Sequence, residues 1–223
     1  MDEMIYVIAT PIGSLSDISS NAVDAIRECD ELFCEDTRTT MNILSRFGIK
    51  GKMLISYREE NEKKMSETAI KHVLEGKRIG IVSDAGMPGI ADPGYRILSA
   101  ACEKGIKVKV IHGQTAFLDA LLKSGFGTDA FLFGGFFPQK ASKRASYMEL
   151  LKENDITGIF YESPHRILKT LLFLKDAFPV SRIAVCRELT KVHEEIKVFE
   201  TSALREEDIT VKGEFTLVLR RKK

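Results

Sequence analysis

The sequence predicts an α/β protein made of two α/β domains, the first with a mostly parallel sheet and the second with a mixed sheet. In the first half, short apolar runs alternate with helical patterns, as in parallel sheets covered by helices. The last apolar runs have only a short segment between them, which indicates antiparallel pairing. The pattern changes near residue 112, so we expect domains at residues 1–112 and 113–223.

In the first domain the helical patterns carry apolar residues at helical spacing, and several of them end at a glycine such as Gly48 or Gly76. Either Asp17 or Ser19 caps the first helix, which buries Ala22 and its neighbours. The expected strands are residues 5–9, 32–34, 53–56, 78–83 and 108–111, and the later helices are residues 40–47, 62–75 and 95–104. The charged stretch 57–62 is typical of a solvated helix start.

The second domain begins with a helix that Thr115 can cap, and a later helix has Pro164 in its first turn. The expected strands are residues 131–133, 157–161, 182–186, 196–199 and 214–219, and the helices are residues 116–123, 142–152 and 164–178. The order of these elements differs from that of the first domain, because strands follow one another at the end without a long helix.

Composition excludes several classes of protein. With 44% hydrophobic and 29% charged residues among 223, the chain is typical of a soluble globular protein. No apolar run approaches the ~20 residues of a membrane span, and the acidic start predicts no signal peptide. Four scattered cysteines predict neither a disulfide framework nor a metal site, and they fit a cytoplasmic protein. The net charge of +1 leaves only local patches for a nucleic-acid partner.

The stretch from residue 82 to residue 94 is the most informative segment. It holds three glycines, two prolines and two aspartates between a predicted strand and a predicted helix. Open α/β sheets bind ligands beyond the carboxyl ends of their strands, so this loop predicts a ligand site, although a tight turn without a ligand is the alternative. Neither this loop nor the turn at residues 10–15 has the dinucleotide or P-loop fingerprint, which argues against NAD and ATP. Asp84 either binds the ligand or caps the next turn.

Two other clusters carry charged side chains after predicted strands. Glu35, Asp36 and Arg38 form either an acid/base or substrate-positioning group or a salt-bridged helix start. Lys140, Lys143 and Arg144 follow the aromatic run 131–137, a combination that suits phosphate contact and base stacking but also occurs on solvated helix faces.

Together these motifs resemble one family. The stretches are residues 9–15, 34–38, 83–94, 160–166 and 188–191. In this order they resemble the ribosomal RNA small-subunit methyltransferases of type I, a branch of the tetrapyrrole methylase (class III) superfamily. The resemblance spans nearly the whole chain.

The resemblance implies two α/β domains with S-adenosylmethionine in a cleft between them, a homodimer, and methylation of a cytidine ribose 2′-hydroxyl in the decoding region of small-subunit rRNA, free or in the 30S particle. It also implies which residues contact the cofactor, namely Pro11, Ser83, Asp84, Ala85, Gly86, Pro88, Thr115, Ala116 and Leu189. We expect Glu35 or Asp36 to orient or deprotonate the hydroxyl, and Arg38 to contact phosphate.

The sequence also departs from this family. Gln114 and Thr115 stand where Pro-Ser is usual, and there is no counterpart of a small C-terminal extension, so RNA affinity would depend on Lys140, Arg144 or residues 220–223. Two alternatives remain open. One is a tetrapyrrole methyltransferase of the same fold, and the other is a non-catalytic ribosome-binding protein with a decayed cofactor cleft.

Overall fold

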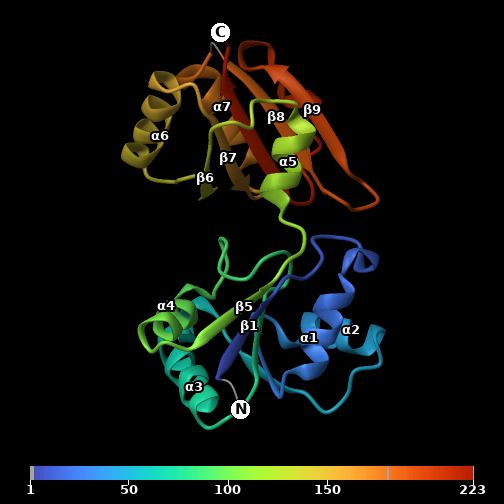
Figure 1. Cartoon of the computed structure of the whole chain (residues 1–223). Coiled ribbons are helices and arrows are strands. Elements are labelled where there is room, and N and C mark those ends of the chain that lie inside the picture. Colours follow the sequence, from blue (N-terminus) through green and yellow to red (C-terminus); the bar gives the residue numbers. More distant parts are fainter. Residues whose placement is uncertain (1–2, 180, 223) are drawn as a thin grey trace. The chain divides into compact units, whose positions relative to one another are not determined.

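The computed structural model describes residues 3–179 and 181–222. The chain divides into two compact units, Met1–Thr115 and Ala116–Lys223, each built around one five-stranded sheet (Figure 1). This division falls just after the change of sequence pattern near residue 112. None of the helices in the described part of the chain is long and apolar enough to cross a membrane.

The sheet of the first unit is entirely parallel, with the strand order β3-β2-β4-β1-β5. The strands are β1 (Met4–Ile8), β2 (Glu31–Cys34), β3 (Met53–Ser56), β4 (Ile79–Val82) and β5 (Lys107–Ile111). Apolar side chains alternate between the two faces, so that Tyr6 and Ile8 join one core while Ile5 joins the other. All five strands were expected from the sequence, within one residue or so at each end.

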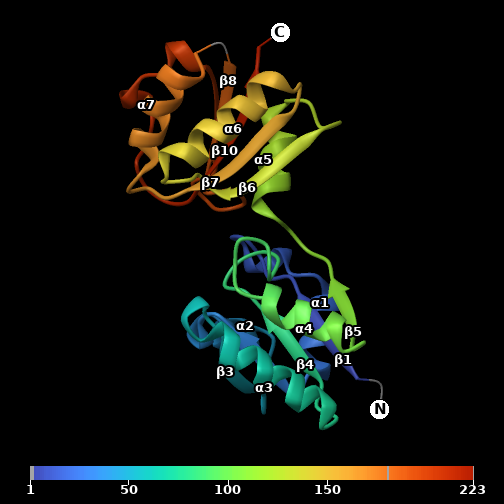
Figure 2. The same ribbon diagram turned by 90° about the vertical axis from the view of Figure 1, so that its left-hand side faces the viewer.

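Helices cover both faces of this sheet (Figure 2). One face carries α1 (Ser20–Glu28) and α2 (Thr37–Arg46), and the other carries α3 (Glu62–Leu74) and α4 (Tyr95–Glu103). The 3-10 turns η1 (Leu15–Asp17) and η2 (Glu59–Asn61) precede α1 and α3. The adjacent strands β1 and β4 continue into helices on opposite faces, and ligands of open α/β sheets bind at the carboxyl edge beside such a switch.

Side-chain caps decide where two of these helices begin. The Ser19 hydroxyl accepts a hydrogen bond from the N–H of Ala22 at 3.1 Å, so Ser19 rather than Asp17 caps α1. The helix expected at residues 40–47 begins earlier, at Thr37, because the Asp36 carboxylate accepts from the N–H of Arg38 at 2.8 Å.

The second unit has a mixed sheet, as expected, and its strand order is β6-β7-β10-β8-β9. Only β6 and β7 pair in parallel, and the other neighbours are antiparallel. The strands are β6 (Phe131–Phe136), β7 (Thr157–Glu162), β8 (Ser181–Arg187), β9 (Glu195–Glu200) and β10 (Phe215–Arg221), with η3 (Thr201–Ala203) and η4 (Glu206–Asp208) before β10. Helices α6 (Ala141–Glu153) and α7 (Ile167–Ala177) pack on one face, and α5 (Ala116–Ser124) packs on the other.

Two elements of this unit differ from expectation. Helix α7 begins at Ile167 rather than at Pro164, because the Ser163 carbonyl accepts from the N–H of both Arg166 and Ile167 and closes a tight turn first. Strand β6 runs three residues beyond Phe133, through an irregularity in its pairing with β7.

Candidate functional site

The turn after β1 and the loop after β4 are joined at the carboxyl edge of the parallel sheet. Thr10 and Gly86 exchange two backbone hydrogen bonds of 2.8 and 3.0 Å, and the Thr10 hydroxyl donates to the Ser83 carbonyl at 3.1 Å. A Cβ on Gly86 would lie 3.3 Å from Ile12 and 3.6 Å from the carbonyl of Gln114. Three segments that the sequence predicted as cofactor contacts therefore meet around Gly86, within the first unit.

The loop from residue 83 to residue 94 closes on itself. Gly94 has a φ of +152°, and a Cβ there would lie 2.7 Å from the backbone nitrogen of Gly89, while the N–H of Gly89 donates to the Pro93 carbonyl at 3.3 Å. Between them Ala91 has a φ of +66°, which is unfavourable for a residue with a Cβ. Strain of this kind persists where surrounding structure imposes it, and it is common at ligand sites.

Glu62 holds the end of this loop in place. Its carboxylate accepts from the N–H of Gly94 at 3.4 Å, from the Tyr57 hydroxyl at 2.9 Å and from Nε of Arg96 at 3.1 Å. Tyr57 is 1% exposed. The charge pattern of residues 57–62 predicts a solvated helix start and does not indicate this anchor. The signal that could have found it is an acid just beyond the end of a third strand.

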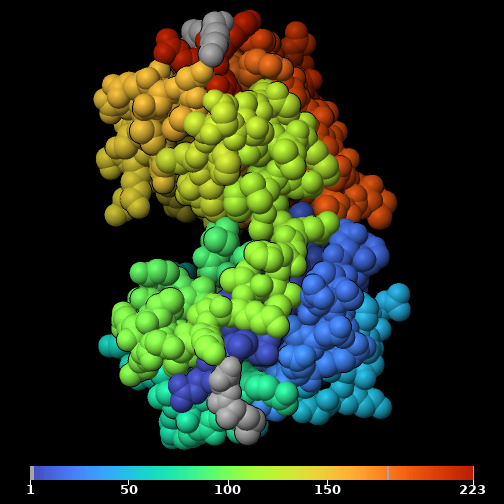
Figure 3. Space-filling view, in the orientation of Figure 1, coloured from blue at the N-terminus to red at the C-terminus, as the bar shows by residue number. Residues whose placement is uncertain are grey.

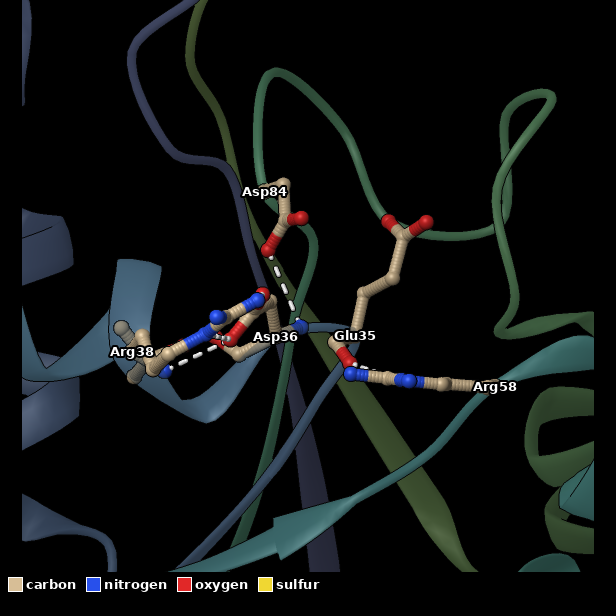
Figure 4. Close-up of polar contacts among 6 residues, drawn as sticks. Glu35, Asp36, Arg38, Arg58 and Asp84 are labelled. Atoms are coloured by element: carbon tan, nitrogen blue, oxygen red, sulfur yellow. Dashed lines mark hydrogen bonds and ion pairs between the residues drawn. The ribbon is translucent and has the colours of Figure 1, made fainter.

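The acids after β2 and β4 lie side by side (Figure 4). Oδ1 of Asp84 accepts from the backbone N–H of Asp36 at 3.1 Å. Asp36 also pairs with the guanidinium of Arg38 at 2.6 Å, and Nε of Arg58 donates to the Glu35 carbonyl at 2.9 Å rather than to its carboxylate. The three predicted catalytic residues thus lie together, beside the predicted cofactor residue Asp84.

Their electrostatics divide these carboxylates into two kinds. Burial, followed by the charge of Asp84, raises the pKa of Glu35, and burial also raises the pKa of Asp84. Burial together with the charges of Glu35 and Asp84 raises the pKa of Asp92 to about 7. In contrast, hydrogen bonds from Arg38 hold the pKa of Asp36 well below its usual range. Asp92 is a further member of this cluster, from the same glycine-rich loop, that the sequence motifs did not indicate.

Two predicted cofactor residues belong to the second unit. Ala116 begins α5, and Leu189, 6% exposed, lies between Glu188 and Thr190, which have φ angles of +51° and +64°. The Glu194 carboxylate accepts from the N–H of Thr190 at 2.6 Å and so holds this strained loop. The Thr190 hydroxyl oxygen is buried without a hydrogen-bond partner in the described structure.

The three predicted RNA-binding residues lie at the start of α6. Lys140 and Lys143 are exposed. Arg144 donates from Nη2 to the Gln139 carbonyl at 2.6 Å, and its guanidinium lies 4.9 Å from the centre of the Phe173 ring. Part of the Arg144 side chain is therefore committed to packing. No group of three or more His, Cys, Asp or Glu within residues 3–179 and 181–222 is arranged to hold a metal.

Comparison with known proteins gives the family. A model of the tetrapyrrole (corrin/porphyrin) methylases matches residues 4–204. This chain belongs to the tetrapyrrole methylase family. It is 41% identical over 217 residues to the ribosomal RNA small subunit methyltransferase I of Halalkalibacterium halodurans, covering 96% of this chain and 75% of that protein. It is 39% identical over 218 residues to the protein of that name from Thermotoga maritima, covering 96% and 97%.

The fold agrees with this membership. A crystal structure of diphthine synthase superposes with a TM-score of 0.76 at 15% identity, covering 97% of this chain and 90% of that one. As a tetrapyrrole methylase, this chain is a methyltransferase that uses S-adenosylmethionine as the methyl donor.

The residues at the carboxyl edge of the first unit fit such a donor. S-adenosylmethionine presents hydroxyl and amino donors and a positive sulfonium. The edge offers the Asp84 carboxylate and a buried acceptor, Oε1 of Gln114, which has no hydrogen-bond partner in the described part of the chain. Gly86 lets the segments of this edge pack closely, because a Cβ there would lie 3.3 Å from the Ile12 side chain.

Proposed function

We propose that this tetrapyrrole methylase transfers the methyl group of S-adenosylmethionine to the ribose 2′-hydroxyl of a cytidine in the decoding region of small-subunit rRNA. The observation that carries the proposal is the similarity, over 96% of the chain, to two proteins named ribosomal RNA small subunit methyltransferase I. An rRNA substrate also implies action in the cytoplasm.

The bound cofactor supplies a methyl group already activated by its sulfonium charge. The protein must then bind and align the donor and the acceptor hydroxyl, and it must exclude water. It must also accept a proton from the hydroxyl, which is weakly nucleophilic. A carboxylate that acts as this base must be free of ion pairs, and its pKa must be raised from the ordinary value towards the working pH. Among the described ion pairs none involves the Glu35 carboxylate, and its pKa is raised. We propose Glu35 as this base.

Asp36 has a different role in this proposal. Its oxygens accept from the backbone and guanidinium of Arg38, and its pKa is lowered, so it is a poor base. It caps α2 and holds Arg38, whose side chain is 86% exposed and has nitrogens left to contact a phosphate.

The cofactor-binding set stays as the resemblance gave it. In the first unit it consists of Pro11, Ser83, Asp84, Ala85, Gly86, Pro88 and Thr115, and in the second unit of Ala116 and Leu189. Pro11, Ser83, Gly86 and Pro88 are buried, and their part in the proposal is to shape the backbone that faces the donor. A homodimer also remains part of the proposal.

The test is a methyl-transfer assay with labelled S-adenosylmethionine on free small-subunit rRNA, on assembled 30S particles and on a tetrapyrrole. We expect label on RNA, at a cytidine ribose that resists alkaline cleavage at that linkage. Label on the tetrapyrrole alone would support the small-molecule alternative, and no cofactor binding in a direct titration would support the non-catalytic one.

Variants assign the base. Glu35→Gln should lose turnover by roughly 100-fold or more while keeping its affinity for S-adenosylmethionine. Asp36→Asn preserves a cap and should lose less. Glu59→Gln, an exposed acid in the next loop, is the matched control and should behave as the wild type. Full turnover in Glu35→Gln would exclude Glu35 as the base.

A further inference from the structure

We propose that Phe136 and Tyr161 form a stacking platform in the second unit for a base of a single-stranded RNA substrate. The proposal rests on the proposed function, since it names how that substrate is held. None of the residues involved belongs to the cofactor-binding or catalytic set above.

The platform is the exposed end of a row of four aromatic side chains. Phe117 of α5 stacks on Phe133 of β6 with ring centres 4.4 Å apart and planes 20° apart. Phe133 meets the edge of Tyr161 at 4.9 Å, and Tyr161 meets Phe136 at 5.8 Å. Helix α5, whose residues lie on the surface in Figure 3, contributes Phe117 to one end of the row. At the other end Phe136 is 55% exposed.

A bulge in β6 places Phe136 in this row. Phe133 pairs with Ile159 and Phe136 pairs with Tyr161, so β6 uses three steps where β7 uses two. Because side chains alternate along a strand, regular pairing would turn Phe136 to the opposite face, towards the core of α6 and α7. The extra residue is accommodated by Gly134 and Gly135: a Cβ on Gly134 would lie 2.3 Å from the Phe160 ring, and Gly135 has a φ of +66°.

A phenylalanine that a bulge turns to the surface in this way can offer its ring to an apolar or aromatic ligand. Bulges recur beside functional sites, where they re-aim a side chain. Exposing a large aromatic side chain lowers solubility without strengthening the fold, whereas a π face is what a nucleobase stacks on.

Basic residues that follow the platform closely in the chain favour RNA over a second apolar surface. Lys140 and Lys143 are exposed within seven residues of Phe136, at the start of α6. No side chain caps that helix, so its first N–H groups add positive potential. Aromatic rings next to basic side chains are the usual means of holding single-stranded nucleic acid without reading its sequence.

The test measures binding of the full-length protein to a single-stranded oligoribonucleotide of about ten nucleotides and mixed sequence, by fluorescence anisotropy. Phe136→Leu keeps an apolar side chain but removes the π face, and it should weaken binding by roughly 5- to 150-fold. Phe136→Trp should bind at least as well as the wild type. Phe131→Leu is the matched control, because Phe131 is 42% exposed at the other end of the same strand, and it should change nothing.

A second readout is independent of affinity. The chain contains no tryptophan, so Phe136→Trp introduces a single reporter. Its emission should be quenched when the oligoribonucleotide is added, while the emission of Phe131→Trp should stay unchanged. Unquenched emission of Phe136→Trp at saturating RNA would overturn the proposal.

Salt and cofactor titrations separate stacking from other roles. Removing the ring should leave the slope of log affinity against log salt unchanged, whereas Lys140→Ala and Lys143→Ala should each reduce it by about 0.7 if they contact phosphates. Unchanged RNA affinity in Phe136→Leu, or a loss confined to S-adenosylmethionine affinity or to self-association, would overturn the platform.

The two proposals fail in different ways. If the wild type binds the oligoribonucleotide but methylates no rRNA, the proposed function is wrong, and the Phe136 variants still decide the platform. If the wild type methylates rRNA and Phe136→Leu binds the oligoribonucleotide normally, only the platform is wrong. If the wild type shows no affinity for single-stranded RNA, the platform is also overturned.

Discussion

The Asp84 carboxylate accepts a hydrogen bond from the backbone N–H of Asp36 at 3.1 Å and so joins the loops that follow β4 and β2. These two residues are 48 positions apart in the chain. The contact places a predicted cofactor residue beside the predicted catalytic group, and it makes the position of Glu35 depend on Asp84.

Replacing Asp84 should weaken cofactor binding. Asp84→Ala removes the carboxylate and leaves the N–H of Asp36 without this acceptor, so we expect affinity for S-adenosylmethionine to fall about 10-fold or more, as for a lost hydrogen bond to a charged group. Asp84→Asn keeps an acceptor for the N–H and should lose less. Isothermal titration calorimetry measures both.

The same two strands supply a matched control for Asp84. At their opposite ends the Asp30 carboxylate accepts from the backbone N–H of Arg78 at 2.9 Å. Asp30→Ala should therefore cost stability but leave cofactor affinity unchanged. Equal effects of Asp84→Ala and Asp30→Ala on affinity would show that Asp84 acts only through the stability of the sheet.

Gly94 should tolerate no side chain. In Gly94→Ala the new methyl group would meet the backbone of Gly89 at 2.7 Å, so the loop from residue 83 to residue 94 must open, and cofactor affinity should fall with stability. Gly105→Ala is the control: its φ of +68° costs about 1 kcal/mol, but nothing lies within 4 Å of the added Cβ. Urea denaturation and cofactor titration of both variants check this, and a Gly94→Ala protein with wild-type affinity would contradict it.

Glu62 should act as a positioning residue. Glu62→Ala leaves the buried Tyr57 hydroxyl without its 2.9 Å partner and frees the N–H of Gly94, so we expect a loss of about 1–3 kcal/mol in the free energy of unfolding. Cofactor affinity should fall as well, and the maximal rate at saturating cofactor should change less. Tyr57→Phe removes only one of these bonds and should cost less.

The exposed neighbour Glu60 supplies the control for Glu62. Glu60→Ala removes a charge from the same turn and should leave both stability and affinity at wild-type values. If Glu62→Ala lowers the maximal rate as much as it lowers affinity, Glu62 does more than hold the loop.

Asp92 should make stability depend on pH. Its pKa rises from an ordinary value of 3.8 to about 7 through burial and through the charges of Glu35 and Asp84. Between about pH 4 and pH 7 the folded state therefore binds more protons than the unfolded chain, so the free energy of unfolding falls as pH rises through this window. Compared with the wild type, Asp92→Asn should therefore gain more free energy of unfolding at pH 8 than at pH 5, as measured by urea denaturation.

Asp24→Asn, at an exposed position on α1, is the control for this pH dependence. It should shift stability by the same small amount at both pH values. A difference between Asp92→Asn and the wild type that is identical at pH 5 and pH 8 would mean that the Asp92 carboxyl is not perturbed by folding.

Much of the fold could be predicted because its signals are local. The five strands of the first unit follow from runs of apolar residues, and the ends of its helices follow from glycines and from caps such as Ser19. The start of α7 was placed three residues too early, because the hydrogen bonds of the Ser163 carbonyl form a turn that Pro164 alone did not indicate.

The sequence by itself determined the alternation of elements, the family motifs and which loops follow the parallel strands, because periodicity, glycine and proline act on neighbouring residues. Only the tertiary structure decided which side chains meet. Glu62 reaches Gly94 across 32 residues, and burial beside Glu35 and Asp84 sets the pKa of Asp92. Likewise, Phe136 joins Tyr161 only through the bulge in β6. Such contacts depend on strand order, register and burial, which arise when the whole chain packs.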